Sequence, residues 1–347
     1  MKKTTKKLYI CLFIFIVFIG LLVIYYVKNN NYINPKDIPN VSGIFKNLLD
    51  EKGDKVNVIA IITHVNNEGD KKTLYEYVNK GIKIIGVCSY LSFPKISDNK
   101  SDVYHKDISI EIDGKFIEDF VIGWCHCFRE PEKYIRGNKP RILLSESDFV
   151  VKAALEEKNL EIKYDYIAHQ PKDNDECELK WHGHNKNWLL AEKCIKVLSD
   201  ELNLKGLIVG RGECPVDVKN KDNVEVTEYI SNWNEFLDKM RESRFILLPN
   251  LEDASPRFLT EGLTLNKPIF VNENILGGWK YVNDDTGVFF NENNIKEQAE
   301  TLLSNYDNYS PKEYFMNNYG EENSGKRLKE FIQSIYPDLS PCKYAKF

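Results

Sequence analysis

The sequence lacks several motifs that would place it in a common class of protein. It has eight cysteines but no Cys-x-x-Cys pair, which argues against a zinc ribbon and against a thioredoxin-type site. No apolar run leads into a Gly-x-Gly-x-x-Gly turn with an acid about 20 residues on, which argues against a dinucleotide-dependent dehydrogenase. Positive charge is not in excess, because the formal net charge is -5, whereas nucleic-acid binders are normally basic. No internal repeat and no long low-complexity tract stands out.

A metal site is also not expected. The run Cys125-His126-Cys127 carries three metal-ligating side chains, but no second ligand pair is spaced to complete a tetrahedral site. We therefore predict no bound metal and no cofactor of the protein's own. Disulfides are compatible with the cysteine content, but the sequence does not assign their pairing.

A long uncharged segment follows the first seven residues. Residues 8–27 form a helix-length run of 20 residues, and at about 1.5 Å each they reach about 30 Å, the hydrocarbon thickness of a bilayer. A cleaved signal peptide is the alternative, but the run is long for one and no Ala-x-Ala-like site follows. Four lysines precede the run, against Lys28 and Lys36 after it, so we predict a cytoplasmic tail at 1–7 and a transmembrane helix at 8–27.

This topology predicts a single-pass type II membrane protein. Its large C-terminal part is expected to be lumenal, in the Golgi or the ER, or otherwise extracytoplasmic. A polar, Asn- and Lys-rich stem is predicted at 28–54, with a short helix near 44–49. Asn-x-Ser sequons at Asn40, Asn99 and Asn308 fit a lumenal location, although such triplets also arise by chance in an Asn-rich chain.

Apolar runs alternate with amphipathic stretches through the rest of the chain. This alternation predicts α/β domains with parallel sheets, and 347 residues leave room for two of them. We expect a small N-terminal domain at 55–160 and a second domain at 161–320. A C-terminal helix and tail are expected at 321–347.

One strand–loop–helix unit carries the functional hypothesis. The apolar run 245–248 predicts a buried strand, and Ser255 and Pro256 have the residue types of an N-cap and of a first helical position. In open α/β sheets ligands bind where such a strand ends and the next helix begins, and a helix N-terminus favours phosphate. Two acids flank this point, Asp253 in the loop and Glu261 eight positions later in the helix.

Five segments of the chain resemble, in order and with similar spacing, the sequence blocks of one family. They are NKNWLLAEKCIKVL (185–198), LKGLIVGRGE (204–213), VEVTEYISNWNEFLDKMRESRFILLPN (224–250), DASPRFLTEGLTLNKPIFVNE (253–273) and GGWKYVNDDTGVFF (277–290). The family is the retaining GT-B glycosyltransferases, the group that includes glycogen and sucrose synthases. The resemblance covers roughly residues 163–292. It implies two Rossmann-like domains, an N-terminal acceptor domain and a C-terminal nucleotide-sugar domain, after the transmembrane helix.

The resemblance also implies roles for individual residues. Lys186 and Arg211 would neutralise the departing diphosphate, with Arg257 as a further cation. Glu261 would accept hydrogen bonds from the two ribose hydroxyls, which suits a carboxylate. Asp253 would bind hydroxyls of the transferred sugar, although the family has the longer Glu at this position. For each of these residues the alternative is a solvated surface charge or a capping side chain.

Further candidates complete the predicted site. Gly212 and Ser255 are expected to bind the donor together with the cations. His126, after an apolar strand, is a third catalytic candidate beside the two acids, because it would hydrogen-bond the sugar or assist proton removal from the acceptor. His64, which also ends a strand, is its rival, and a buried structural histidine is the alternative for both.

Three tryptophans and one lysine remain as weaker candidates. Trp181, Trp188 and Trp279 would stack on the base or the sugar, unless they belong to the core, as large aromatic side chains more often do. Lys280, next to a Gly-Gly turn, is a candidate to face the donor phosphate.

The sequence therefore predicts a membrane-anchored glycosyltransferase that is retaining and independent of metal. It would move a sugar from a nucleotide-diphosphate donor to a glycan, protein or lipid acceptor. The alternative is a catalytically inactive member that serves as a binding or scaffold subunit of a glycosylation complex. The expected partners are the nucleotide sugar, the acceptor and the membrane through 8–27, with no nucleic acid.

Overall fold

The structure is a computed structural model of the chain. It describes residue 17 and residues 32–91, 93–94, 111–150, 158, 160–173, 177 and 180–347. The predicted tail at 1–7 and the predicted transmembrane helix at 8–27 lie outside these residues, apart from residue 17. Within the described part, no helix combines the length and the apolar character needed to cross a bilayer.

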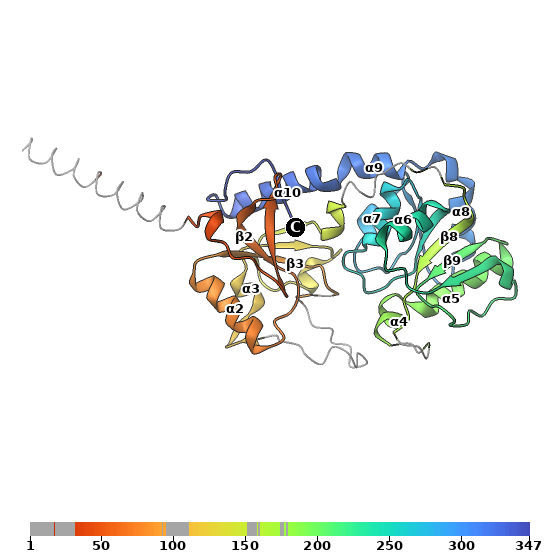
Figure 1. The fold of residues 1–347 in the computed structure, drawn as a ribbon, viewed down its shortest axis with the longest axis horizontal. Helices are drawn as coiled ribbons and strands as arrows, with labels where there is room; N and C mark the ends of the chain where they lie inside the picture. The colour runs from red at the N-terminus through yellow and green to blue at the C-terminus, as the bar shows by residue number, and fades with distance from the viewer. Residues whose placement is uncertain are drawn as a thin grey trace, which may run out of the picture.

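Two α/β domains lie side by side, and within the described residues each is built on a sheet of six strands (Figure 1). The first domain runs from red to yellow at the left of the view, and the second is mostly green and cyan at the right. Helix α10 (Gly320–Ile335) lies along the top of the first domain, although it follows the second domain in the sequence. The predicted pair of α/β domains is therefore confirmed, and the chain returns to the first domain after completing the second.

The first sheet has the order β14-β1-β2-β3-β6-β7. Its strands are β1 (Phe45–Asp50), β2 (Lys55–Ile61), β3 (Lys83–Val87), β6 (Trp124–His126), β7 (Arg141–Leu143) and β14 (Ala345–Lys346). The four strands β2, β3, β6 and β7 are parallel, whereas β1 runs antiparallel to β2 and β14 antiparallel to β1. Smaller elements of this domain are η1 (Pro35–Asp37), α2 (Glu68–Asn79), β4 (Glu111–Ile112), β5 (Lys115–Phe116), α3 (Ile117–Phe120), η2 (Pro131–Lys133) and η3 (Glu146–Phe149).

Strand β1 corrects one expectation, because the short helix predicted near 44–49 is wrong. Phe45 and Leu48 are three positions apart, which on a helix would place them on one face. In the strand they point to opposite faces, so Phe45 packs in the cluster with Tyr77, 5.1 Å between ring centroids, and Leu48 packs in the cluster beneath α10. The first sheet thus begins inside the segment predicted as a stem at 28–54.

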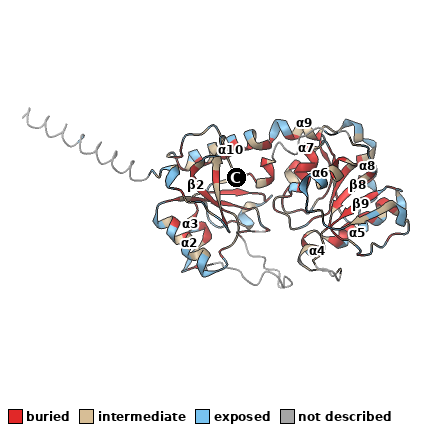
Figure 2. Ribbon diagram, in the orientation of Figure 1, coloured by how far each residue is buried: buried red, intermediate tan, exposed pale blue. Residues whose placement is uncertain are grey.

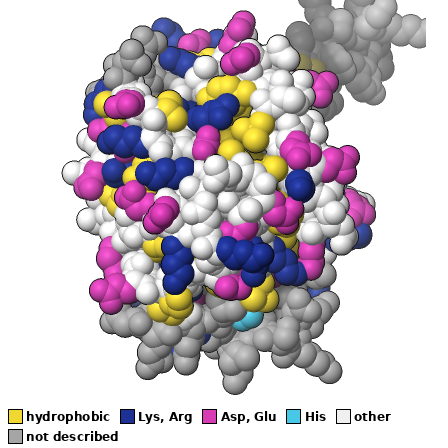
Figure 3. Space-filling model, turned by 90° about the vertical axis from the view of Figure 1, so that its right-hand side faces the viewer, with side chains coloured by type: hydrophobic (Ala, Val, Ile, Leu, Met, Phe, Trp, Pro, Cys, Tyr) yellow, Lys and Arg dark blue, Asp and Glu magenta, His cyan; other side chains and the backbone are white. Residues whose placement is uncertain are grey.

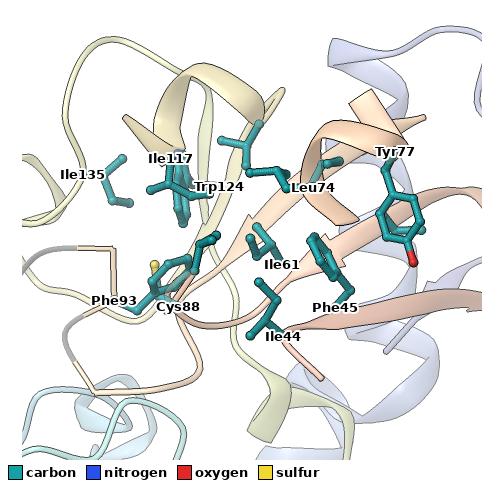
Figure 4. Close-up of a cluster of buried hydrophobic side chains, with 14 of the residues drawn as sticks. Ile44, Phe45, Ile61, Leu74, Tyr77, Cys88, Phe93, Ile117, Trp124 and Ile135 are labelled. Atoms are coloured by element: carbon teal, nitrogen blue, oxygen red, sulfur yellow. The ribbon is translucent and has the colours of Figure 1, made fainter. Parts of the chain in front are cut away.

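Apolar side chains fill both faces of the first sheet. Figure 4 shows the cluster on one face, where Phe45, Ile61 and Trp124 from the sheet meet Leu74 and Tyr77 from α2. The other face is covered by the apolar side of α10, and the buried cluster there includes Leu328, Ile332 and Tyr336. Because α10 supplies part of this core, the first domain is incomplete without the C-terminal segment.

The second sheet is wholly parallel and has the order β10-β9-β8-β11-β12-β13. Its strands are β8 (Tyr164–His169), β9 (Gly206–Val209), β10 (Val224–Thr227), β11 (Ser243–Leu248), β12 (Ile269–Asn272) and β13 (Gly287–Phe290). The chain starts in the middle at β8, winds outward to β10, and then returns to β11 on the other side of β8. This is the doubly wound order, and its reversal point between β8 and β11 is where such sheets leave a crevice for a ligand.

Helices cover both faces of the second sheet. They are α4 (Trp181–Asn185), α5 (Trp188–Lys196) with its π-helical continuation η5 (Val197–Glu201), α6 (Trp233–Arg241), α7 (Arg257–Thr264), α8 (Ile295–Ser304) and α9 (Pro311–Asn318). Short 3-10 turns occur at η6 (Lys221–Asn223), η7 (Trp279–Tyr281) and η8 (Tyr306–Asn308). Along β11 the buried side chains alternate, since Phe245 and Leu247 join one core and Ile246 and Leu248 the other. In Figure 2 the central strands of both sheets are accordingly mostly red, and exposed residues lie on the outer faces of the helices.

Helix α7 packs unusually close to this sheet. A Cβ added at Gly262 would lie 2.5 Å from Cγ1 of Ile246 on β11, so only glycine allows the observed approach. All residues from Phe258 to Thr264 are buried. The helix that carries Glu261 is therefore rigidly placed against the strand that precedes it.

The outer end of the second domain carries charges of both signs. In the face that Figure 3 shows, Lys and Arg side chains lie among Asp and Glu side chains, with small apolar areas between them. No basic area dominates that face, in keeping with the negative formal net charge of -5.

Candidate functional site

The candidate site lies at the reversal point of the second sheet. Strand β8 ends at His169, and β11 ends at Leu248, one residue before the loop that leads into α7. Because parallel strands end at the same edge, the β11–α7 loop and the end of β8 face the same crevice. The sequence prediction placed the site on this loop, and the topology puts that loop at the position where open α/β sheets bind ligands.

Asp253 is held in this loop by three donors. Lys186 Nζ lies 2.7 Å from Oδ2 and Asn250 Nδ2 also lies 2.7 Å from Oδ2, while the backbone amide of Ser255 donates to the same carboxylate. Burial by itself would raise the pKa of Asp253, but the Lys186 ammonium and these hydrogen bonds outweigh it and lower that pKa below its ordinary value. Asp253 is therefore ionised at neutral pH and already oriented.

Lys186 reaches Asp253 because the joint between α4 and α5 is fastened to the same loop. The carbonyl oxygen of Asn185 accepts hydrogen bonds from the amides of Leu251 and Glu252, at 3.0 and 3.3 Å. The side chains of Lys186 and Asp253 remain 24% and 17% exposed, so the pair is accessible from the crevice. The structure thus brings together two residues that lie 67 positions apart in the sequence.

Glu261 has a different environment from Asp253. Its Oε1 accepts a hydrogen bond from Trp233 Nε1 at 3.0 Å, and the residue is 9% exposed. Burial raises the pKa of Glu261, and the Trp233 hydrogen bond and the charge of Arg257 only partly oppose that rise. The two acids predicted for the site therefore differ, with Asp253 paired to a cation and Glu261 bonded to a neutral donor.

A cavity of about 560 Å³ opens between the two domains beside Glu261. On the second domain its wall is made by Trp233, Ser255, Arg257 and Glu261. On the first domain its wall is made by Lys46, Ser89, Glu146, Phe149, Val150 and Phe347. The volume is that of a small-molecule site. Asp253, Lys186 and His126 do not line this cavity, so the predicted site residues fall into two groups around α7.

Ser255 does not cap α7, and that expectation is wrong. The N-cap is Pro256, and the helix begins at Arg257, one residue later than predicted. Ser255 Oγ instead accepts a hydrogen bond from the amide of Ser147 in the first domain, at 2.8 Å. No local sequence pattern indicates this contact, because it joins residues 108 positions apart.

Arg211 stacks on an aromatic side chain of α5. Its guanidinium lies 3.8 Å from the ring centroid of Trp188, a core residue, and Nη2 lies 3.5 Å from the carbonyl oxygen of Cys177. Gly212 uses its amide to bond the carbonyl of Thr227 at 2.9 Å. Both residues thus form the turn after β9, and a role for them in holding a diphosphate stays a prediction.

A disulfide fastens this turn to the loop after β8. Cys177 and Cys214 are bonded, with their Cα atoms 5.5 Å apart, and they lie 37 positions apart in the sequence. The amide of Cys214 also bonds the carbonyl of Arg211 at 3.0 Å. The pairing that the sequence left open is therefore made between two loops at the ligand-binding edge of the second sheet.

His126 ends β6 in the first domain, as the sequence indicates. Its ring stacks near Phe128, with centroids 6.3 Å apart, and burial lowers its pKa to about 4, helped by the positive charges of Lys280 and Arg141. The imidazole is therefore neutral at physiological pH and free of the positive charge that would prevent it from accepting a proton. His64, its rival, packs edge-on against Phe93 at 5.0 Å.

Lys280 is used in a contact between the domains, and its role as a phosphate ligand stays a prediction. It is buried and forms an ion pair with Asp148 of the first domain, with Nζ 2.6 Å from Oδ2. Trp279 donates from Nε1 to the carbonyl of Cys127 at 2.8 Å, and Trp188 is a core residue. The side chain of Trp181 lies outside the described part of the chain.

Two residues at the site were not identified from the sequence. Trp233 holds Glu261, and His169 sits among Phe236, Phe258 and Tyr229, with ring centroids 5.4, 6.0 and 6.1 Å away. Burial lowers the pKa of His169 to about 4, assisted by the charge of Lys186. Neither has a local sequence signal, because each acquires its neighbours from separate helices and loops.

A metal-binding cluster is not part of the described site. Within the residues that the structure describes, no group of three or more His, Cys, Asp or Glu side chains has an arrangement that could hold a metal ion. Positive charge near the acidic loop comes from the protein itself, through Lys186 and Arg257.

Comparisons with known proteins bear on the fold. No protein-family model matches the sequence, and no curated protein matches it either. The structure is similar to AviGT4, a glycosyltransferase of avilamycin A biosynthesis, with TM-score 0.50 and 10% identity over 75% of this chain and 70% of that one. It is similar to sucrose-phosphate synthase from Thermosynechococcus elongatus, with TM-score 0.52 and 8% identity over 77% and 72% of the two chains. Anabaena HepE in complex with UDP gives TM-score 0.52 and 8% identity over 78% and 77%.

These likenesses, at 8 to 10% identity, concern the fold alone. The prediction of a GT-B-like architecture is confirmed.

Proposed function

We propose that this protein is a glycosyltransferase that uses a nucleotide-diphosphate sugar as donor. One observation carries the proposal: Asp253, paired with Lys186, and Glu261, held by Trp233, flank the start of α7 at the reversal point of a doubly wound sheet. The loop–helix unit supplies an acid for sugar hydroxyls and an acid for the ribose diol, and the joint between α4 and α5 adds Lys186 as a cation for phosphate. The GT-B fold supports the same proposed function.

The proposed chemistry breaks the bond between the anomeric carbon and the nucleoside diphosphate and forms a bond from that carbon to an acceptor hydroxyl oxygen, which gives up its proton. The charge that develops on the leaving phosphates needs fixed positive partners, and Lys186, Arg257 and the free amides at the start of α7 are available for it. Lys186 would then exchange its bond with Asp253 for a phosphate oxygen and release that carboxylate to the sugar hydroxyls. No metal is required by this scheme.

His126 is proposed to act on the acceptor side. It belongs to the first domain, and burial lowers its pKa to about 4, so it is neutral and can accept a proton or a hydrogen bond. The acceptor is proposed to be a glycan, a protein or a lipid that enters from the first-domain side, next to His126. Retention of anomeric configuration is proposed from the resemblance of the donor segments, and the anomeric form of the product tests it directly.

The proposed location is the far side of a membrane. The uncharged run at 8–27 with lysines before it supports a single-pass type II anchor. The Cys177–Cys214 disulfide supports an oxidising compartment, because such bonds are rare in the cytosol. Protease protection of the C-terminal domain in sealed microsomes tests this orientation.

The decisive experiment is a donor panel assayed with the full chain in detergent micelles. We expect hydrolysis or transfer from at least one nucleotide sugar, with UDP-sugars tested first because HepE was crystallised with UDP. Glu261→Gln and Asp253→Asn should each lower turnover at least about a hundredfold. Glu225→Gln is the matched control, since Glu225 only bonds the hydroxyl of Tyr164 at the opposite edge of the sheet.

A scaffold without activity is the second candidate, favoured by one observation. Asp253 is shorter than the family's Glu and is already neutralised by Lys186. Calorimetry with the same donor panel separates the two functions. Absence of binding by every nucleotide sugar, in a chain that unfolds cooperatively, would contradict the transferase and support the scaffold.

A further inference from the structure

A buried polar cluster joins the two domains next to the candidate site. Asp148, on η3 of the first domain, is 0% exposed. Its carboxylate accepts hydrogen bonds from Lys280 Nζ at 2.6 Å and from the Tyr281 hydroxyl at 2.5 Å, and both donors belong to the second domain. The amide of Ser145 supplies a third donor at 2.8 Å.

Stability alone does not account for this cluster. Moving a carboxylate and an ammonium out of water costs several kcal/mol each, and apolar residues of the same shape often stabilise a fold at least as well. A fully hydrogen-bonded buried group does favour a single geometry, because only one arrangement satisfies every donor and acceptor. The cluster therefore fixes how η3 meets the loop that carries Lys280 and Tyr281.

A continuous set of hydrogen bonds runs from Asp148 to Asp253. The hydroxyls of Tyr281 and Ser147 lie 2.9 Å apart, and the amide of Ser147 donates to Ser255 Oγ at 2.8 Å. The amide of Ser255 in turn donates to the carboxylate of Asp253. Four bonds thus connect the buried inter-domain carboxylate to the carboxylate proposed to bind the sugar.

The loop before Lys280 holds the acidic loop from a second side. The amide of Gly277 donates to the carbonyl of Asp253 at 2.9 Å, and that of Leu276 donates to Leu251 at 2.8 Å. A Cβ at Gly277 would lie 2.0 Å from the carbonyl oxygen of Ala254, so the two loops touch through their backbones. Any displacement of the 276–281 loop is therefore passed directly to Asp253.

Helix α10 anchors the whole arrangement. Ser324 Oγ donates to the backbone carbonyl of Asp148 at 2.9 Å, and α10 itself is packed on the first sheet. The acidic loop is consequently held by bonds that originate in the first sheet's covering helix, outside the donor domain.

We propose that Asp148, Ser147 and Tyr281 are positioning residues of the donor site, which hold the Asp253 loop in the geometry needed for the sugar. The proposal rests on the proposed function, and it assigns to the first domain a part in orienting the donor. These residues act through Ser255 and Asp253 and touch neither donor nor acceptor.

The kinetic test is Tyr281→Phe in the full chain. Phenylalanine keeps the ring packed against Tyr319, whose centroid is 4.9 Å away, and loses only the hydroxyl. The variant loses the hydrogen bonds of the hydroxyl to Asp148 and to Ser147. We expect kcat to fall about five- to tenfold, while the KM for the donor changes less than about twofold. A loosened loop spends less time in the reactive geometry, and this affects the transition state more than the bound donor.

The matched control is Tyr164→Phe. Tyr164 is also buried, and its hydroxyl also donates to a carboxylate, that of Glu225 at 2.7 Å, but at the amino end of β8. We expect a comparable loss of stability without the fall in kcat. An equal fall in both variants would show that Tyr281 acts only through general stability and would overturn the proposal.

A second measurement does not need activity. We expect amide hydrogen exchange of residues 251–257 to be about tenfold faster in Tyr281→Phe than in wild type, and unchanged in Tyr164→Phe. If the wild type turns over no donor, the proposed function fails while this exchange test still decides the positioning. Unchanged exchange in an active enzyme overturns the positioning and leaves the function in place.

Ser147→Ala completes the design with a smaller change. It removes the hydroxyl that bonds Tyr281 and keeps the amide that bonds Ser255. Because both variants break the same link, their effects on exchange should not add in the double variant, whereas Tyr281→Phe and Tyr164→Phe should add. If the effects of Ser147→Ala and Tyr281→Phe on exchange add in the double variant, the two residues do not act through the same set of hydrogen bonds, and the proposal is contradicted. This comparison also holds if Tyr281→Phe by itself folds poorly.

Discussion

The indole of Trp233 donates a hydrogen bond to the carboxylate of Glu261 across 3.0 Å. Trp233 opens α6 and Glu261 lies within α7, so the bond joins two consecutive helices on one face of the second sheet. Trp233 is 39% exposed and also lines the inter-domain cavity. One side chain therefore orients the acid and forms part of the wall beside it.

Replacing Trp233 by Phe should weaken donor binding. The ring is kept but the N–H donor is lost, and a buried carboxylate without its donor is less well oriented and more costly to keep charged. We expect about five- to tenfold weaker binding of the donor identified in the panel, measured by calorimetry. Glu235→Gln, an exposed change on the same helix, is the control, and equal affinities in all three proteins would contradict the role of Trp233.

Glu261→Gln should make the protein more stable at neutral pH while it abolishes activity. Burial raises the pKa of Glu261 above its ordinary value of 4.5, so the folded state disfavours the charged form. Stability from this group therefore rises as the pH falls through the folded pKa, and at pH 7 the charge opposes folding. We expect a gain of up to about 1 kcal/mol in urea unfolding at pH 7, since a pKa unit corresponds to about 1.4 kcal/mol.

The gain should disappear in acid. Below pH 4.5 the carboxyl is protonated in both the folded and the unfolded chain, and the variant then loses its advantage. Glu235→Gln, an exposed change, should alter the free energy of unfolding by less than about 0.5 kcal/mol at either pH. A loss of stability in Glu261→Gln at pH 7 would contradict this prediction, because it would show that the charged carboxylate of Glu261 stabilises the folded state.

Lys186→Met should destabilise the fold at neutral pH and less so in acid. The pKa of Asp253 is lowered, so its contribution is present above the ordinary value of 3.8 and is lost as the pH falls through the folded pKa. Removing the cation leaves a poorly solvated carboxylate, at a cost of about 1–3 kcal/mol at pH 7. Urea unfolding at pH 7 and near pH 3 measures both values.

Two further variants sharpen that experiment. Lys193→Met breaks the exposed pair with Glu292 and should cost less than about 1 kcal/mol at either pH. Lys186→Met combined with Asp253→Asn should recover part of the stability, because no unpaired charge remains. If the double variant is no more stable than Lys186→Met alone, the charge on Asp253 is not what Lys186 compensates.

Loss of the Cys177–Cys214 disulfide should lower stability and loosen the Arg211 turn. A cross-link between residues 37 positions apart contributes about 4 kcal/mol in the chain-entropy model. We expect the thermal midpoint of the wild type to fall when dithiothreitol is added. The Cys177→Ser, Cys214→Ser double variant should show that lower midpoint from the start and no response to the reductant. A reductant response in the double variant would assign the effect to another cysteine.

Local patterns predicted the elements near the site well. We expected β11, the polar loop after it and the helix that follows. Buried strands and amphipathic helices each produce a characteristic hydrophobic periodicity in consecutive residues. The prediction failed at β1, where a short helix was expected near 44–49 and the structure has a strand. Pairing with β2, which follows β1 after a short turn, and with β14, near the end of the chain, decided that segment.

Side-chain partners were less predictable than elements. Ser255 has the residue type of an N-cap and Lys280 that of a phosphate ligand, yet both are used by the first domain, through Ser147 and Asp148. A hydrogen bond is decided by which atoms lie within about 3 Å, and residues more than 100 positions apart reach that distance only after the domains have met.

The sequence by itself determined the alternating α/β architecture, the strand–loop–helix unit and the two acids eight positions apart, because these depend on residue type and spacing along the chain. Only the tertiary structure decided that Lys186 neutralises Asp253, that Trp233 holds Glu261 and that Asp148 ties the donor loop to the first domain. The physical reason is the sequence separation of the interacting residues. Hydrophobic periodicity depends on residues that are close in the sequence, whereas these ion pairs and buried hydrogen bonds join residues that only the complete fold brings together.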